Sequence, residues 1–480
     1  MPSKPIIVWF RNDLRLADNR ALSAAVAAGA PLLPVFIYDP QGGGRWAPGA
    51  ASRWWLHHSL AAFAEALSEH KAPLILRRGR AEDILADIVA ETGAAAIYFS
   101  RAYEPWARAE EDRVKQRFAT GDVDIKRFAG ALLREPEDVR TKSGEPFKVY
   151  TPFWRALTAL GAPSAPLAAP KSFPSAKKKL ASDRLADWHL LPEKPDWAAG
   201  LREAWCPGEA GARDRLETFL DAGLAGYAGN RNLPAVDGTS RLSPHLHFGE
   251  ISPRVCWHRA IAVRENGKAG DTAVETFLKE LVWREFSYHL LVHWPHIPDK
   301  PFKPEFSAFP WKKSAGHLKA WQRGLTGYPI VDAGMRQLWH TGWMHNRVRM
   351  IVASFLVKHL LIPWQSGEDW FWDTLVDADL AANAASWQWV AGSGADAAPY
   401  FRIFNPITQG EKFDADAAYV RQWVPEIAGL PDDVIHAPWT ASASVLAKAG
   451  VSLGKTYPLP LVDHAEARQR ALEGYAAMRS

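Results

Sequence analysis

The sequence predicts an N-terminal doubly wound α/β domain with a parallel, Rossmann-like sheet, followed by a long connector and a C-terminal all-helical domain. Three observations predict this arrangement. Short apolar runs alternate with helical segments over residues 1–131, irregular sequence follows, and helical periodicity with almost no strand signal continues from about residue 214. A length of 480 residues also agrees with two domains. We expect domains at 1–131 and 206–480, with the connector at 132–205.

The elements of the first domain are expected in strict alternation. Apolar runs predict strands at residues 6–10, 32–38, 74–76 and 95–99, and helical patterns lie at 20–28, 52–68 and 81–91. Right-handed crossovers through such helices make the strands parallel and bring their carboxyl ends to one edge. Sheets of this kind bind ligands beyond that edge, but no GxGxxG motif follows the first strand. Ordinary dinucleotide binding is therefore not supported.

The connector is the least regular part of the chain. Its segment GAPSAPLAAPKSFPSAKKKL is rich in proline, alanine and lysine, which favours neither long helices nor strands. We expect residues 132–205 to lie over the surface between the two domains.

Composition excludes several classes of protein. Two cysteines, Cys206 and Cys256, cannot form a disulfide framework, a four-thiolate zinc site or an iron–sulfur cluster, and no run of about 18 apolar residues predicts a membrane span. The formal charge of +4 is compatible with a nucleic-acid partner but too small to demonstrate one. We expect a cytoplasmic monomer with no metal site and no membrane contact.

Three segments of the predicted helical domain combine charged or amide groups with aromatic or thioether groups on one helical face. The faces are Asp379, Asn383 and Trp387; Glu280, Trp283 and Arg284; and Asn346, Arg349 and Met350. Taken singly, such a face is more often solvated or a satisfied polar pair, and a buried tryptophan usually serves packing. Three faces of this kind in one domain favour a single polar site with stacking surfaces.

A further candidate is the loop-like run from Thr239 to Ser243. Small hydroxyls beside backbone amides at a loop-to-helix junction can hold a phosphate. A hydroxyl-rich helix cap explains the same pattern, and both readings stay open at this point.

Four stretches resemble the DNA photolyase and cryptochrome family. They are VWFRNDLRLADN, DGTSRLSPHL, GYPIVDAGMRQLWHTGWMHNRVRM and DLAANAASWQWVAGSGADAAPYFRIFNP. The resemblance covers essentially the whole chain and is strongest to the bacterial class I cyclobutane pyrimidine dimer photolyases. It implies an antenna domain followed by a helical domain, which holds FAD in a folded shape beneath a pocket for a flipped-out dimer.

The resemblance implies a set of FAD contacts in the helical domain. They are Tyr227, Thr239, Ser240, Arg241, Leu242, Ser243, Arg284, Asn346, Arg349, Asp377, Asp379 and Asn383. In this reading Asp377 pairs with Arg349 near the isoalloxazine, and Asn383 faces the flavin N5. Signalling relatives often have Asp or Cys at that place, so Asn383 favours repair.

The resemblance also implies residues for UV-damaged DNA and for electron transfer. The dimer would contact Glu280, Trp283, Asn346, Met350 and Trp389. The phosphates around the dimer would contact Arg231, Arg347 and Arg402. Electrons would reach the flavin through Trp311, Trp364 and Trp387. The implied enzyme is a deoxyribodipyrimidine photo-lyase, a carbon–carbon lyase in which excited FADH⁻ lends one electron to the dimer and regains it after the ring splits. Cryptochrome-type blue-light signalling is the alternative.

The antenna site is implied less directly. Folate-binding members carry an Asn-Glu pair where this chain has Trp106 and Ala107, whereas Asp39, Arg53 and Glu104 are more similar to deazaflavin-binding members. The expected antenna chromophore is therefore 8-hydroxy-5-deazaflavin, favoured over folate, and ordinary loop charges are the alternative reading of these residues.

Overall fold

The computed structural model describes residues 4–174, 176, 180–397 and 401–479. Its N-terminal part is a five-stranded sheet with the order β3-β2-β1-β4-β5, in which every neighbouring pair is parallel. The strands are β1 (Ile6–Phe10), β2 (Leu32–Tyr38), β3 (Ile75–Arg78), β4 (Ala96–Ser100) and β5 (Asp124–Phe128). Helices α1 (Arg20–Ala27), α2 (Ala50–Glu69), α3 (Ala81–Thr92) and α4 (Pro105–Arg117) connect them, with the 3-10 turn η1 (Gly44–Trp46). The predicted doubly wound α/β fold is confirmed.

Two elements of this domain were not predicted. Strand β5 has the sequence DIKRF and lies mostly exposed at the sheet edge, so it lacks the apolar run by which the other strands were found. Helix α4 is charged along most of its length and buries only Ala107, Glu111 and Val114, which leaves little amphipathic pattern to detect.

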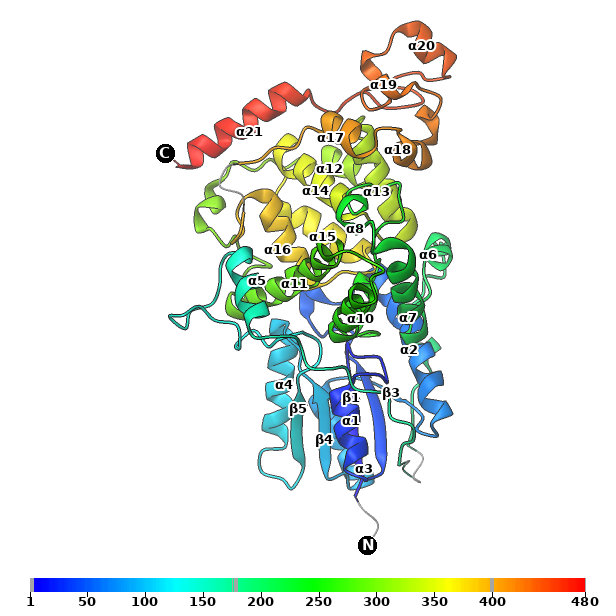
Figure 1. Cartoon of the computed structure of the whole chain (residues 1–480), viewed down its shortest axis with the longest axis vertical. Coiled ribbons are helices and arrows are strands. Elements are labelled where there is room, and N and C mark those ends of the chain that lie inside the picture. The colour runs from blue at the N-terminus through cyan, green and yellow to red at the C-terminus, as the bar shows by residue number, and fades with distance from the viewer. Residues whose placement is uncertain (1–3, 175, 177–179, 398–400, 480) are drawn as a thin grey trace.

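The rest of the chain is helical and forms the upper part of Figure 1. The segment between the domains contains α5 (Tyr150–Ala159), η2 (Leu185–Trp188) and α6 (Ala199–Ala204), and α5 packs beside α11. The helical domain then comprises α7 (Glu209–Thr218), η3 (Phe219–Gly223), α8 (Tyr227–Asn230), α9 (Ser243–His247), α10 (Pro253–Glu265), α11 (Asp271–His293), η4 (Pro304–Ala308), α12 (Ala315–Gln322), α13 (Pro329–Thr341), α14 (Asn346–Ser354), η5 (Phe355–His359), α15 (Trp364–Thr374), α16 (Leu380–Ala391), α17 (Pro406–Phe413), α18 (Ala418–Trp423), η6 (Pro425–Ile427), α19 (Asp432–Ile435), η7 (Pro438–Thr440), α20 (Ala443–Lys448) and α21 (His464–Arg479).

Buried polar contacts join the two domains at the carboxyl edge of the sheet. Arg254 of α10 pairs with Asp18 at 2.8 Å, and Arg15 donates to the carbonyl oxygen of Gly249 at 2.8 Å. All three side chains are almost fully buried. Because buried polar groups need hydrogen-bond partners, these side chains are satisfied when the helical domain lies on the sheet in this orientation.

Candidate functional site

A cavity of about 590 Å³ opens between α11, α14 and α16 of the helical domain. All three of the mixed helical faces line it, and so do most of the residues implied by the resemblance. These are Tyr227, Arg231, Ser240, Ser243, Glu280, Trp283, Arg284, Asn346, Arg347, Arg349, Met350, Asp377, Asp379, Asn383, Trp387 and Trp389. The fold therefore brings together residues that lie up to 162 positions apart in the sequence, from Tyr227 to Trp389.

Asp379 forms the N-cap of α16 and is held on both carboxylate oxygens. Its Oδ1 accepts a hydrogen bond from the backbone N–H of Ala382 at 2.9 Å, while the hydroxyl of Tyr288 donates to Oδ2 and His247 Nδ1 lies 3.5 Å from that oxygen. Burial alone would raise the pKa of Asp379, but the hydrogen bonds and the charges of His247 and Arg284 lower it to about 2. The cavity therefore contains a fixed, buried negative charge at neutral pH.

Asn383 lies one turn further along α16, with its amide nitrogen anchored. Its Nδ2 donates to the backbone oxygen of Glu368 at 3.1 Å, which fixes the plane of the amide and leaves its oxygen as the atom that can accept a hydrogen bond from a ligand. The carboxyl of Glu368 is itself fully buried, and neither oxygen has a hydrogen-bond partner within the described part of the chain. Burial raises the pKa of Glu368 well above its usual range, which favours the neutral form of this acid behind the cavity wall.

Arg349 and Asp377 form the predicted ion pair. One guanidinium nitrogen of Arg349 lies 3.0 and 2.8 Å from the two carboxylate oxygens of Asp377, and Nε donates to the carbonyl oxygen of Met344 at 2.8 Å. The side chain of Asp377 is 4% exposed and that of Arg349 is 24% exposed. Arg349 thus presents a positive charge to the cavity, and the more deeply buried Asp377 holds that charge in place.

On the side predicted for the lesion, Glu280 pairs with Arg231 at 2.8 Å. Burial raises the pKa of Glu280, and the charge and hydrogen bond of Arg231 oppose that rise. Trp283 and Trp389 are both half-buried and line the same cavity, which gives it two flat aromatic surfaces. Arg347 hydrogen-bonds Asn232 at 2.6 Å beside them.

Part of the predicted phosphate segment lies outside the cavity wall. Ser240 and Ser243 line the cavity, but Thr239, Arg241 and Leu242 are not among its lining residues. The backbone oxygens of Thr239 and Ser240 accept hydrogen bonds from Arg215 at 2.8 and 2.9 Å, which holds the turn in place.

Three residues implied by the resemblance, Arg241, Leu242 and Arg402, lie in other surroundings. Arg241 has a φ of +48° and lies 3.5 Å from Asp237, while the side chain of Leu242 is buried in the core. Arg402 is exposed and likewise is not among the lining residues.

The three tryptophans predicted for electron transfer lie in or against one hydrophobic core. Trp387 and Trp364 are each 2% exposed within that core, and half-buried Trp311 packs against it. Trp387 contacts Phe371, with ring centroids 5.0 Å apart, and Trp321, with centroids 6.2 Å apart. Trp387 lines the cavity, whereas Trp311 is partly reached by solvent.

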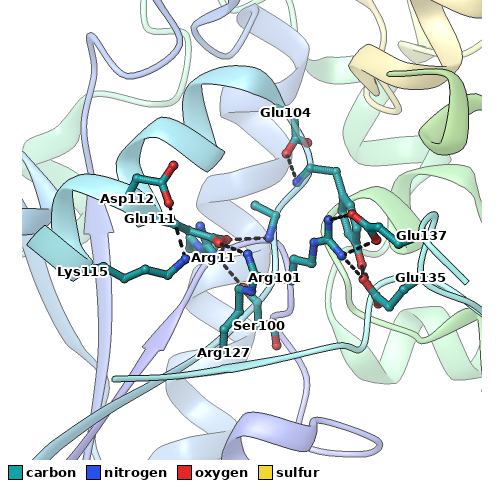
Figure 2. Close-up of polar contacts among 12 residues, drawn as sticks. Arg11, Ser100, Arg101, Glu104, Glu111, Asp112, Lys115, Arg127, Glu135 and Glu137 are labelled. Atoms are coloured by element: carbon teal, nitrogen blue, oxygen red, sulfur yellow. Dashed lines mark hydrogen bonds and ion pairs between the residues drawn. The ribbon is translucent and has the colours of Figure 1, made fainter. Parts of the chain in front are cut away.

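The residues predicted for the antenna are divided between two environments. Asp39 accepts from the backbone N–H of Gln41 at 3.0 Å and Arg53 donates to the oxygen of Pro48 at 2.8 Å, so both bind their own loop. Glu104 points away from the Arg11 and Glu111 cluster (Figure 2). Burial raises its pKa, Asp379 adds to that rise and His247 opposes it, which places Glu104 at the boundary with the helical domain.

The side chains around the cavity fit FAD. Small residues at positions 378, 382 and 385 leave room for a flat ring against α16 and the turn before it. The Arg349–Asp377 pair and the Asp379 carboxylate offer charges and acceptors, and the hydroxyls of Ser240 and Ser243 offer donors for phosphate oxygens. Among the described residues no group of three or more His, Cys, Asp or Glu side chains is arranged to hold a metal ion, and no helix is long and apolar enough to cross a membrane.

Several contributors to this site were not predicted from the sequence. They are Tyr150, His247, Tyr288, Trp321 and Glu368. Only Tyr288 carried a usable signal, since it continues the spacing of Glu280 and Arg284 on α11. The others act across segments that are distant in sequence.

Comparison with known proteins agrees with this geometry. Residues 6–171 match the family described as DNA photolyase, and residues 277–477 match the FAD binding domain of DNA photolyase. A deoxyribodipyrimidine photo-lyase from Agrobacterium fabrum is 53% identical over 100% of this chain and 99% of its own length. Cryptochrome-1 of Arabidopsis thaliana is 40% identical over 98% of this chain and 70% of its own length.

Solved structures give the same result. The crystal structure of a bacterial class III photolyase from Agrobacterium tumefaciens superimposes with a TM-score of 0.97 at 53% identity, covering 100% of this chain and 98% of that one. A Synechocystis cryptochrome superimposes with a TM-score of 0.89 at 30% identity, covering 98% of this chain and 99% of that one. The chain belongs to the DNA photolyase and cryptochrome family and carries that family's FAD-binding domain.

Proposed function

We propose that this protein is a DNA photolyase that splits cyclobutane pyrimidine dimers with light. The observation that supports this most directly is the shared cavity. Two half-buried indoles and a carboxyl with a raised pKa face the same space as the polar groups suited to a flavin. The similarity to proteins named deoxyribodipyrimidine photo-lyase supports the same activity.

The cofactor part of the proposal assigns each polar group a task. Reduced FAD supplies the excited electron that splits the dimer and takes that electron back, so the reaction is redox-neutral. Arg349, held by Asp377, stabilises negative charge on the reduced ring, and Asp379 accepts hydrogen bonds from the cofactor. Asn383, anchored through Glu368, presents a neutral amide oxygen. Ser240 and Ser243 bind phosphate oxygens, together with the turn 239–243 that Arg215 holds.

The DNA part of the proposal concerns the rim and walls of the cavity. Trp283 and Trp389 stack on the two pyrimidines after the lesion leaves the helix, a step made easier because a dimer already stacks and pairs poorly. Glu280, which pairs with Arg231 at 2.8 Å, hydrogen-bonds the carbonyl and imide edge of a pyrimidine. Arg231, Arg347 and Arg402 bind phosphates near the lesion, with Asn346 and Met350 completing the pocket.

Two accessory roles belong to the same proposal. Trp311, Trp364 and Trp387 pass electrons from the surface to an oxidised flavin, and 8-hydroxy-5-deazaflavin serves as antenna near Asp39, Arg53 and Glu104. The first is supported by the placement of the indoles in one core. The second is supported by the sequence pattern alone, and absorption spectra of the purified holoprotein beyond the flavin bands test it.

The experiment for the main proposal is dark and illuminated incubation of the reduced protein with an oligonucleotide that contains one thymine dimer. Recovery of thymine absorbance only in the light supports repair. The alternative is blue-light signalling, and the chain is 40% identical to Cryptochrome-1 of Arabidopsis thaliana. Bound, photoreducible FAD with no repair would favour signalling and refute the repair proposal.

A further inference from the structure

The connector between the domains places an aromatic side chain behind Trp283, a residue of the cavity wall. Tyr150 is the first residue of α5 and lies flat against Trp283 of α11, with ring centroids 3.6 Å apart and an interplanar angle of 5°. Because Tyr150 covers one face of this indole, only the opposite face of Trp283 remains for a ligand. A surface linker has no need of so close a stack.

The tyrosine ring is fixed at its far end as well. Its hydroxyl donates to the backbone oxygen of Lys279 at 2.7 Å, one turn before Trp283 on the same helix. Tyr150 is 7% exposed, and Phe153 and Phe286 pack beside it in the same core cluster. Tyr150 is therefore attached to α11 at both its ring and its hydroxyl, and it restricts rotation of Trp283.

A second contact links Tyr150 to another residue of the cavity wall. Its backbone N–H donates to Oδ2 of Asp396 at 3.2 Å, and Asp396 lines the cavity. The turn that precedes Asp396 is tied back to α16, since the N–H of Gly394 donates to the oxygen of Gln388 at 3.0 Å. Trp389 is the next residue of α16. Tyr150 thus contacts α11 directly and is linked through Asp396 to the turn that follows α16, so it connects with both helices that carry the stacking indoles.

We propose that Tyr150 is a positioning residue for the damaged-base pocket, an inference that rests on the proposed function. It holds Trp283 with one face toward the cavity and, through Asp396, sets the separation between Trp283 and Trp389. Two linked pyrimidines require both indoles at a fixed separation, whereas undamaged DNA, which keeps its bases stacked in the helix, does not. Tyr150 therefore contributes to the preference for damaged over undamaged DNA without touching the lesion.

The test compares equilibrium binding in the dark of the FAD-loaded protein to matched oligonucleotides with and without one thymine dimer. Tyr150→Leu removes the stack and should weaken dimer binding about 2- to 10-fold, the range expected for one aromatic pair. Tyr150→Phe keeps the stack and should stay within about twofold of the wild type. Binding of the undamaged strand and the flavin content should not change in either variant.

A matched control removes a comparable stack elsewhere. Tyr38 lies on Trp188 in the sheet domain, with ring centroids 5.2 Å apart and an interplanar angle of 28°. Tyr38→Leu should leave the ratio of damaged to undamaged affinity as in the wild type, although it also removes a buried ring. Equal loss of that ratio in the Tyr38 and Tyr150 variants would show a general effect of lost packing and overturn the proposal.

A variant that leaves the tyrosine intact tests the second contact. Asp396→Ala removes the acceptor for the backbone N–H of Tyr150 and should lower the same ratio. It keeps the experiment decisive if Tyr150→Leu does not fold. If the wild type prefers the dimer and Tyr150→Leu has the same ratio of damaged to undamaged affinity, the inference is overturned. If Tyr150→Leu cannot be made, an unchanged ratio in Asp396→Ala overturns it. If the wild type itself binds both strands equally, the proposed function fails instead.

Discussion

Gly367 of α15 provides a sharp test of how tightly the cavity wall is packed. It is buried, and a Cβ at this position would lie 2.1 Å from Cη2 of the Trp387 indole. Ordinary contacts begin at 3.4 Å, so Gly367→Ala must displace the indole by about 1.3 Å (3.4 − 2.1). Trp387 packs against Phe371 and Trp321 within the core but also lines the cavity, so the open direction for the indole is toward the cavity proposed to bind the flavin.

The cost of this substitution should therefore appear in cofactor binding more than in folding. Overpacking a filled site costs about 1–3 kcal/mol, which corresponds to a decrease in FAD affinity of about 5- to 150-fold. In the protein without FAD the indole can move into the cavity, and alanine in a helix gains roughly 0.5–1 kcal/mol over glycine, so the free energy of unfolding should change little.

Titration of the protein stripped of flavin with FAD, followed by flavin fluorescence, measures the effect. Gly316→Ala is the matched control, because Gly316 is an exposed residue of α12 with no atom within 4 Å of its added Cβ. The control should bind FAD as the wild type does. If Gly367→Ala also bound FAD with wild-type affinity, Trp387 could not form the wall of the flavin site, and the reasoning would be refuted.

Three further predictions concern electron transfer and pH. Trp311→Phe should slow light-driven reduction of oxidised FAD but leave repair by pre-reduced protein intact, as measured by flavin absorbance and dimer repair; loss of repair by the pre-reduced variant would contradict the assignment. Asp379→Asn keeps a helix-capping side chain but removes a carboxylate whose pKa the fold lowers from 3.8 to about 2. The free energy of unfolding in urea should therefore be about 2 kcal/mol lower than that of the wild type at neutral pH. Because a lowered carboxyl pKa stabilises the fold only above the unfolded value, that deficit should shrink as pH falls from about 4 toward 2, and a pH-independent deficit would contradict it. Burial raises the pKa of Glu368 in the folded protein, so the wild type loses stability as the pH rises above 4.5, the usual pKa of a glutamate. Glu368→Gln cannot ionise, so its urea midpoint relative to that of the wild type should rise between pH 5 and pH 8. A constant difference between the two midpoints would show that Glu368 is ionised in the fold.

The parallel sheet could be predicted because its inner strands are continuous apolar runs. Strands β1 and β2 were placed at their observed bounds, since each is buried on both faces. Edge strand β5 and charged helix α4 could not be found in this way, because their stability depends on neighbours rather than on their own pattern. The connector contains more structure than its proline-rich composition suggested, because α5 packs on α11.

The site could be predicted where one helix carried several of its groups. Asn383 and Trp387 lie on a common face of α16, and that spacing indicated a polar site once two similar faces were found elsewhere in the domain. The contacts of Tyr150 with Trp283 and of Asn383 with Glu368 join separate segments, so no periodicity in the sequence contains them. The run from Thr239 to Ser243 shows the opposite case. The whole run was predicted to contact the cofactor, but Thr239 and Leu242 do not line the cavity.

Light-dependent repair by the wild-type protein is the most direct measurement of the proposed splitting of pyrimidine dimers. Reduced holoprotein is mixed with an oligonucleotide that contains one thymine dimer, illuminated with blue or near-ultraviolet light, and compared with a dark control by thymine absorbance at intervals. The shared cavity of Trp283, Trp389 and Glu280 with the flavin-binding groups predicts recovery in the light and none in the dark. No recovery in the light, with FAD bound and reduced, would contradict the account.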